Sequence, residues 1–321
     1  MSSTTLITKD GERLIATPKK KKMTKDRWTL LALASPFLLF FLAFNYLPLF
    51  GWSLSFFSYR PGLTFETMDF VGLQYFRWMF TTDWIDVSRV LTNTLAMSGL
   101  LLLCSPLPMF LAILLNEVRS TKYKRFIQTF TTLPNFVSWV IIFSLAFALF
   151  STDGMINMIF YNGGIIDEPV KILDNRDIVW RFQTMLNIWK GTGWAAIIYI
   201  AAIAGIDQEQ YEAAIVDGAG RFQRAIYITL PGLMPTFFTL FLLNMGWLLS
   251  AGEGLNQYLN FYNALVAPRI ETLDYFVYRV GILSGAFSYA TAVGMLRSVV
   301  SVLMLVIANY VSKAIRGTGL F

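Results

Sequence analysis

The chain of 321 residues contains no histidine and one cysteine, Cys104. Catalytic triads and Cys–His pairs need a histidine, and a zinc site needs three or four Cys, His or carboxylate ligands. Both kinds of site are therefore excluded or nearly so, and no disulfide can form within the chain. Cys104 follows the apolar run 100–103, which is typical of a small buried hydrophobic residue.

Charged residues are also scarce. They make up 14% of the chain and hydrophobic residues 55%, whereas a soluble domain averages about 25% charged residues. This deficit is too large for a water-soluble surface, and the 28 Phe and 9 Trp suit contact with a lipid bilayer. Nucleic acid is not expected as a partner, because the basic residues are clustered and the rest of the chain is apolar.

The chain lacks the phosphate-binding loop G-x-x-x-x-G-K-[ST], so it is not itself an ATPase. No carboxylate falls in the middle of an apolar stretch, and Lys190 and Arg297 are the only charges there. Proton- or sodium-coupled transporters usually keep ionisable residues at that depth. A secondary transporter is therefore the weaker alternative, and a membrane enzyme is weaker still because no acid/base pair or activated nucleophile stands out.

Six segments have the length of about 20 mostly apolar residues that a membrane-spanning helix needs. They are 28–50, 90–115, 129–150, 179–203, 233–249 and 289–310. The tail 1–27 and the alternate connecting segments hold 16 of the 26 basic residues. Positive residues favour the cytoplasmic side, so this placement predicts a multi-pass protein with both termini in the cytoplasm and a disordered tail.

The polar segment 207–231, between the fourth and fifth expected spans, predicts two short helices joined by a turn. Asp207 is a suitable N-cap, and Glu212 lies in an early turn, where the helix dipole favours acids. Gly218 and Gly220 end the first helix, because glycine adopts left-handed backbone angles at little cost. The small side chains leave a surface that a large partner can approach closely, although an interfacial amphipathic helix is the simpler alternative.

The spacing within this segment reads Glu212-Ala213-Ala214, three residues, Gly218, nine residues, and then Ile228-x-Leu230-Pro231. It resembles the coupling-helix motif of binding-protein-dependent ABC importer permeases. Further stretches resemble the sugar-permease branch of that family, and the closest resemblance is to the polysaccharide-importer subclass. These stretches are 71–76, 93–95, 115–119, 133–139, 189–194 and 289–294, with Asn309.

The resemblance implies an all-α membrane protein with six transmembrane helices, in the type I ABC importer permease fold over residues 28–321. It implies that segment 207–231, called the coupling loop below, docks on a separate ATPase subunit. The residues expected to make that contact are Glu212, Ala213, Ala214, Asp217, Gly218, Ala219, Leu230 and Pro231.

The resemblance also implies partners. These are a second, related permease subunit, two ATPase subunits that hold ATP and Mg²⁺, and an extracytoplasmic solute-binding protein, all at a bacterial cytoplasmic (inner) membrane. No cofactor or metal is expected in this chain. The predicted cargo is an oligosaccharide released from a polysaccharide, and the alternatives are a smaller sugar or glycerol phosphate.

Sites for sugars combine aromatic platforms with amides and hydroxyls. The fourth and fifth spans flank the coupling loop, and each offers such residues at helical spacing i, i+3, i+4, i+7. The predicted substrate-binding residues are Asn187, Lys190, Gly191 and Trp194 on the fourth span, with Asn244, Trp247, Leu248 and Ala251 on the fifth. The simpler interpretation is helix packing in which amides join the helices.

Overall fold

The computed structural model describes residues 6–7, 13–14, 25–64, 66–250 and 254–316. The chain divides into two compact units, Met1–Ser53 and Leu54–Phe321. In the first unit, β1 (Leu6–Ile7) pairs antiparallel with β2 (Arg13–Leu14), and α1 (Lys25–Asn45) follows. Most of the tail 1–27 lies outside the described residues, so its predicted disorder stays a prediction.

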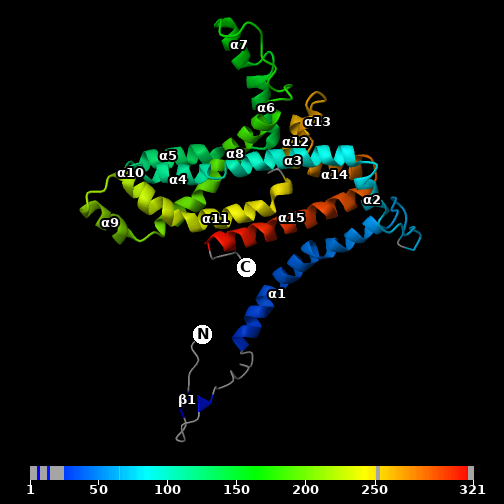
Figure 1. Ribbon diagram of the computed structural model, residues 1–321, viewed down its shortest axis with the longest axis horizontal. Coiled ribbons are helices and arrows are strands. Elements are labelled where there is room, and N and C mark those ends of the chain that lie inside the picture. Colours follow the sequence, from blue (N-terminus) through cyan, green and yellow to red (C-terminus); the bar gives the residue numbers. More distant parts are fainter. Residues whose placement is uncertain (1–5, 8–12, 15–24, 65, 251–253, 317–321) are drawn as a thin grey trace. The chain divides into compact units, whose positions relative to one another are not determined.

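The second unit is helical (Figure 1). After the 3₁₀ stretch η1 (Leu47–Phe56), which crosses the boundary between the units, come α2 (Gln74–Phe80), α3 (Trp84–Leu103), α4 (Leu107–Asn116), α5 (Thr121–Thr132), η2 (Leu133–Phe136), α6 (Trp139–Phe150), α7 (Met155–Asn162), α8 (Val179–Ala204), α9 (Gln208–Val216), α10 (Arg221–Arg224), η3 (Ala225–Thr229), α11 (Leu230–Gly246), η4 (Leu248–Ser250), α12 (Gly254–Phe261), α13 (Ala267–Ile270), α14 (Leu273–Tyr278), η5 (Arg279–Leu283) and α15 (Phe287–Arg316). The predicted all-α fold class is confirmed.

Among the described residues, five helical stretches are long and apolar enough to cross a membrane. They are Trp28–Phe56, Trp84–Asn116, Trp139–Asn162, Arg221–Gly246 and Phe287–Tyr310. Helix α8 makes a sixth when it is taken together with α9, to which it is joined by a bend of 72°. Six spans were expected, and each expected segment overlaps one of these stretches.

The third and fifth spans depart from the expected boundaries. Segment 129–150 is not one helix, because α5 ends at Thr132, η2 contains Pro134, and α6 begins only at Trp139. Proline lacks the N–H group that would continue the ladder of hydrogen bonds and clashes with the preceding turn, so the helix breaks there. The fifth span ends at Gly246 instead of 249, where the N–H of Trp247 closes a tight turn on the carbonyl of Asn244 at 3.0 Å.

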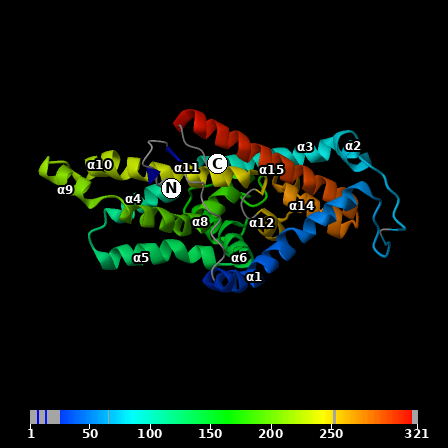
Figure 2. The ribbon, with the colours of Figure 1, turned by 90° about the horizontal axis from the view of Figure 1, so that it is seen from below.

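Helix α8 is the common element of the second unit. It contacts α3, α4, α5 and α11 (Figures 1 and 2). Its buried side chains contribute to two apolar clusters, one shared with α6 and α12 to α14 and the other with α4 and α11. A third cluster joins α2, α3, α14 and α15.

The break between α5 and α6 lies directly on α8. A Cβ atom at Gly193 would stand 2.0 Å from the carbonyl oxygen of Thr131, so the two backbones touch there and only glycine fits. One turn earlier, the buried Lys190 ammonium donates a hydrogen bond of 3.0 Å to the carbonyl of Asn135 and lies 5.8 Å from the centre of the Trp139 ring. Lys190 thus satisfies a carbonyl that the broken helix leaves open.

We expect Gly193→Ala to lower the midpoint of thermal unfolding, because the added methyl group must push two backbones apart. Overpacking of this kind costs about 1–3 kcal/mol. Gly191→Ala is the matched control, since a Cβ atom there meets no other atom within 4 Å and alanine is the better helix former by about 1 kcal/mol. The midpoints are measured in detergent by fluorescence-detected size exclusion. Equal midpoints for the two variants would contradict the close contact.

Candidate functional site

The coupling loop begins where α8 bends into α9. The side chain of Asp207 accepts a hydrogen bond of 3.0 Å from the N–H of Glu209, which confirms the N-cap expected there. Glu212 and Ala213 are exposed on α9, and Ala214 is half-buried. The first helix therefore has a defined start and leaves two residues of the predicted docking set open to solvent.

Gly218 ends α9 in a Schellman motif. Its φ angle is +78°, in the left-handed region where glycine avoids the cost that other residues meet. The N–H of Gly218 bonds to the carbonyl of Ile215 at 3.0 Å, and the N–H of Ala219 bonds to the carbonyl of Ala214 at 2.8 Å. These paired bonds satisfy carbonyls at the helix end and fix the direction of the chain beyond it.

The second half of the loop is continuous with the fifth span. The second expected helix is present over 221–229, as one turn of α-helix, α10, followed by the π-helical turn η3, and it runs on into α11 without a break. Leu230 and Pro231 are the first two residues of α11, directly after this π-helical turn. The hydroxyls of Tyr211 and Thr229 lie 2.9 Å apart and tie α9 to η3.

The coupling loop presents large apolar side chains to solvent. Val216 is 87% exposed, Phe222 77% and Tyr227 76%. Side chains of this size, grouped around a turn of fixed geometry, are typical of a surface that another protein covers.

An ion pair joins the coupling loop to the end of α4. The guanidinium of Arg221 lies 2.9 Å from the carboxylate of Glu117 and also donates to the backbone carbonyl of Glu117. Helix α4 packs on α8 and α11 through the cluster that contains Met109, Ala112 and Tyr199. The loop is therefore connected to three helices, α8, α11 and α4.

The predicted substrate residues of α8 divide between two surroundings. Lys190 is buried against the α5–α6 break, whereas Gly191 borders open space and Trp194 is half-exposed, with its ring edge-on to Phe136 at 5.6 Å. Asn187 donates to the side chain of Gln257. The four residues share one helical stretch, in which Trp194 is exposed, Asn187 and Gly191 are half-buried and Lys190 is buried.

The second predicted set does not lie on one helical face. Asn244 is in α11, Trp247 follows the end of that helix, Leu248 is in η4, and Ala251 lies outside the described residues. The expectation of a continuous helix through these positions is therefore wrong. Even so, Asn244, Trp247 and Leu248 border one cavity of about 180 Å³ together with residues of α3 and the turn after it.

Several residues of these arrangements were missed by the sequence reasoning. Phe136 pairs with Trp194, and Gln183 with Gln257 completes an amide cluster around Asn187. The sequence placed Glu117 only in the stretch 115–119 and did not indicate its ion pair with Arg221. Gln257 belongs to no expected span, so only the folded chain brings it next to Asn187, 70 residues earlier.

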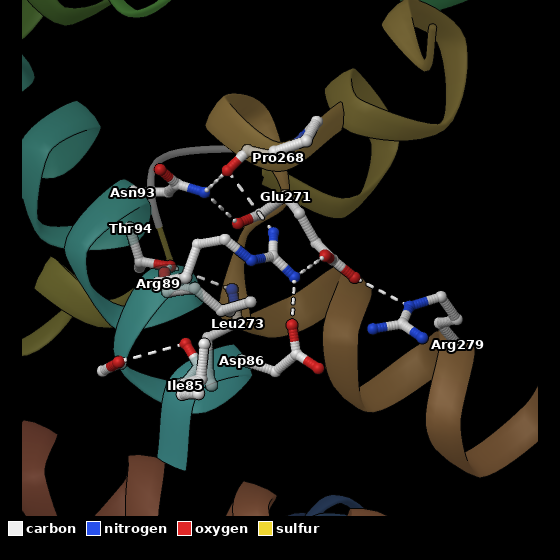
Figure 3. A network of polar contacts seen from close by, with 11 residues as sticks. Ile85, Asp86, Arg89, Asn93, Thr94, Pro268, Glu271, Leu273 and Arg279 are labelled. Atoms are coloured by element: carbon white, nitrogen blue, oxygen red, sulfur yellow. Dashed lines mark hydrogen bonds and ion pairs between the residues drawn. The ribbon is translucent and has the colours of Figure 1, made fainter. Parts of the chain in front are cut away.

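The segment α12 to α14 is held to α3 by a buried carboxylate (Figure 3). Glu271 lies between two guanidinium groups, Arg89 at 2.9 Å and Arg279 at 2.8 Å. The amide of Asn93 donates to the carbonyls of Pro268 and Glu271, and the hydroxyl of Thr94 accepts from the N–H of Leu273. The segment is thus joined to α3 through Arg89, Asn93 and Thr94.

A second ion pair explains Arg297, one of the two charges well inside the expected apolar stretches. Its guanidinium bonds to the carboxylate of Asp274 on α14. Burial raises the pKa of the Asp274 carboxyl, and the guanidinium opposes that shift. Arg297 therefore joins α15 to the same segment that Glu271 joins to α3.

Known proteins share both the sequence and the fold. A family model described as "Binding-protein-dependent transport system inner membrane component" matches residues 105–317. The chain is 43% identical to protein LplB of Bacillus subtilis (strain 168) over 93% of this chain and 92% of that protein. It is 38% identical to the polygalacturonan/rhamnogalacturonan transport system permease protein YteP of the same organism, over 89% of this chain and 88% of that protein.

A solved structure has the same arrangement of helices. It is a chain of a bacterial alginate ABC transporter in complex with an alginate pentasaccharide-bound periplasmic protein. The TM-score is 0.81 and the identity 32%, over 92% of this chain and 98% of that chain.

Proposed function

Since this chain belongs to the family of binding-protein-dependent transport system inner membrane components, we propose that it lines the path of an oligosaccharide whose import a separate ATPase drives through the coupling loop. The chain is a multi-pass permease subunit of a binding-protein-dependent ABC importer, not an enzyme. Separate surfaces of the chain contact the ATPase and the sugar.

The observation that carries the proposal is the coupling loop itself. A chain without a phosphate-binding loop has a rigid turn that exposes Val216 and Phe222 and is joined to α8, α11 and α4. Two ATPase subunits, each with ATP and Mg²⁺, dock on this loop and on its counterpart in a second, related permease subunit. In this arrangement the chain spans a bacterial cytoplasmic membrane, and the loop and both termini lie on the cytoplasmic side.

The contact surface within the loop consists of the predicted coupling residues. Glu212, Ala213 and Asp217 are exposed, and Gly218 admits close approach because it has no side chain. Closure of the ATPase subunits moves the loop as a unit, since the Schellman motif and the Tyr211–Thr229 bond hold its two halves together. A solute-binding protein delivers the cargo on the other side of the membrane.

The cargo is an oligosaccharide of polysaccharide origin. The names of YteP and of the alginate transporter support this class, and Trp194, Phe136 and Trp247 supply exposed rings on which sugars can stack. Two of the predicted residues, Lys190 and Asn187, are bonded to other parts of the chain. They position the pathway, while Gly191, Trp194, Asn244, Trp247 and Leu248 border it.

The loop is tested by substitution at Gly218. We expect Gly218→Val to abolish uptake in proteoliposomes with the ATPase and binding protein present, because a β-branched residue at positive φ costs about 1–2 kcal/mol and distorts the turn. Gly218→Asn is the control, since asparagine tolerates this backbone conformation. Both variants should insert normally. Wild-type uptake by Gly218→Val would contradict a coupling role for the turn.

The Arg221–Glu117 pair is tested by reversal of charge. Glu117→Arg or Arg221→Glu alone places like charges together, and coupled uptake should fall about twofold to fivefold, as expected for an exposed ion pair. The double variant restores the attraction and should recover much of that loss. Arg119→Glu controls for a change of charge beside the pair. Additive losses in the double variant would exclude the pair as a link to α4.

The aromatic platforms are tested by Trp194→Ala and Trp247→Ala. Each should lower oligosaccharide uptake about twofold to tenfold, the range that aromatic contacts contribute, while ATPase stimulation by the loaded binding protein persists. The substrates are galacturonate and alginate oligosaccharides, with neutral cellopentaose for comparison. Trp189→Ala serves as control because it removes another exposed ring of α8. Unchanged uptake in both variants would make these residues packing elements only.

A further inference from the structure

A cavity of about 630 Å³ lies at the end of the second unit that is opposite the coupling loop (Figures 1 and 2). Three segments border it: the residues after η1, helix α2 with the turn into α3, and the turn between η5 and α15. Apart from Ser288 and Tyr289, its lining lies outside the stretches that could cross a membrane. Since the proposed function places the coupling loop in the cytoplasm, this cavity is at the outer surface.

The first of these segments is held in place by hydrogen bonds of its backbone. The N–H of Ser58 bonds to the carbonyl of Asp69 at 2.9 Å, and the N–H of Tyr59 bonds to the hydroxyl of Ser288 at 3.0 Å. The second of these bonds joins the segment after η1 to the start of α15. The cavity is thus formed without a ligand, and a site that is already ordered binds with a smaller loss of entropy.

Aromatic side chains border the cavity and pack on their neighbours. The ring of Tyr75 is edge-on to Trp78, with centres 5.4 Å apart, and lies 6.4 Å from the ring of Tyr289. Tyr59 is edge-on to Phe287 at 5.8 Å. Trp78 is 43% exposed, so part of its ring is open to a ligand. Tyr and Trp combine an apolar ring with a polar group that can form a hydrogen bond, which suits them to a sugar ring and its hydroxyls.

The same cavity is bordered by a cation and an anion. Arg60 is exposed and pairs with no carboxylate within the described part of the chain. Asp83 is the N-cap residue of α3, but its side chain makes no capping hydrogen bond. Hydroxyls of Ser58, Thr82 and Ser284 border the same space. A guanidinium binds a carboxylate through two parallel hydrogen bonds, and a carboxylate accepts hydrogen bonds from hydroxyls.

Size and charge narrow the ligand. The volume lies within the roughly 300–1,000 Å³ of small-molecule pockets. A metal ion is not matched, since no group of three or more metal-binding side chains occurs among the described residues. A ligand that is anionic throughout would meet the carboxylate of Asp83. A ring with several hydroxyls and one carboxylate, which is a uronate sugar, matches both Arg60 and Asp83.

We propose that this cavity, called the outer sugar site below, binds a uronate unit of the oligosaccharide before the chain enters the membrane. Arg60 bonds to the carboxylate, Trp78 supplies a ring face, and Asp83 accepts hydrogen bonds from the sugar hydroxyls. The inference rests on the proposed function, because it concerns the same cargo. It adds a site away from the predicted residues of α8 and α11, and it specifies an acidic cargo.

The test is equilibrium binding of tritium-labelled trigalacturonate to the importer in nanodiscs, without the solute-binding protein. Arg60→Gln should weaken binding about tenfold, as expected for the loss of a hydrogen bond between charged groups, and Trp78→Ala about twofold to tenfold. Methyl-esterified trigalacturonate has no charge, so Arg60→Gln should not change its affinity. Arg77→Gln and Trp84→Ala are the matched controls, because both residues are exposed and neither borders the cavity.

Wild-type affinity for trigalacturonate in the Arg60→Gln/Trp78→Ala double variant would overturn the assignment. If that variant instead loses affinity for the solute-binding protein alone, the cavity is a protein contact. Thermal unfolding midpoints level with those of the two controls show that the variants are folded, and Arg60→Lys, which keeps the charge, should retain part of the affinity. An equal loss in Arg60→Lys and Arg60→Gln together with a lowered midpoint would make Arg60 structural.

Uptake by the wild-type importer, measured with the same trisaccharide and with neutral cellopentaose, separates the two proposals. If trigalacturonate is imported but the double variant binds it as the wild type does, only the outer sugar site fails. If cellopentaose alone is imported, the acidic cargo and the outer sugar site fail while the proposed function stands. If neither is imported, the proposed function fails.

Discussion

The contact between α8 and the broken third span is the constraint on which the second unit depends. A break in a helix leaves carbonyl groups without their partners in the next turn. Here the ammonium of Lys190 bonds to the carbonyl of Asn135, and Gly193 lets the two backbones touch. A buried cation is costly to desolvate, and the carbonyl of Asn135 and the face of Trp139 compensate for part of its lost hydration.

Because α8 is fixed on one side by the break, its other contacts can transmit motion. The helix continues through a bend into the coupling loop, and that loop returns into α11. The Arg221–Glu117 pair adds α4. Three helices are therefore connected to one surface, and one apolar cluster packs these helices together.

The segment α12 to α14 is attached to its neighbours in a different way from the coupling loop. It is attached by charges, Glu271 between two arginines and Asp274 with Arg297, whereas the coupling loop is attached mainly by backbone geometry and apolar contacts. Buried ion pairs resist partial separation, because one partner left alone is a desolvated charge. This segment is thus joined to α3, and the cavity beside Trp247 lies where α3 meets the end of α11.

The sequence alone determined the fold class, the number of spans and the turn of the coupling loop. Each depends on local properties, namely apolar length, the N-cap at Asp207 and the left-handed backbone at Gly218. The tertiary structure decided which polar groups meet. Glu117 and Arg221 are 104 residues apart, and Lys190 and Asn135 are 55 apart. The periodicity of a sequence does not specify pairs that lie so far apart. The tertiary structure also showed helix ends at Pro134 and Gly246, where apolar composition alone predicted a continuous helix.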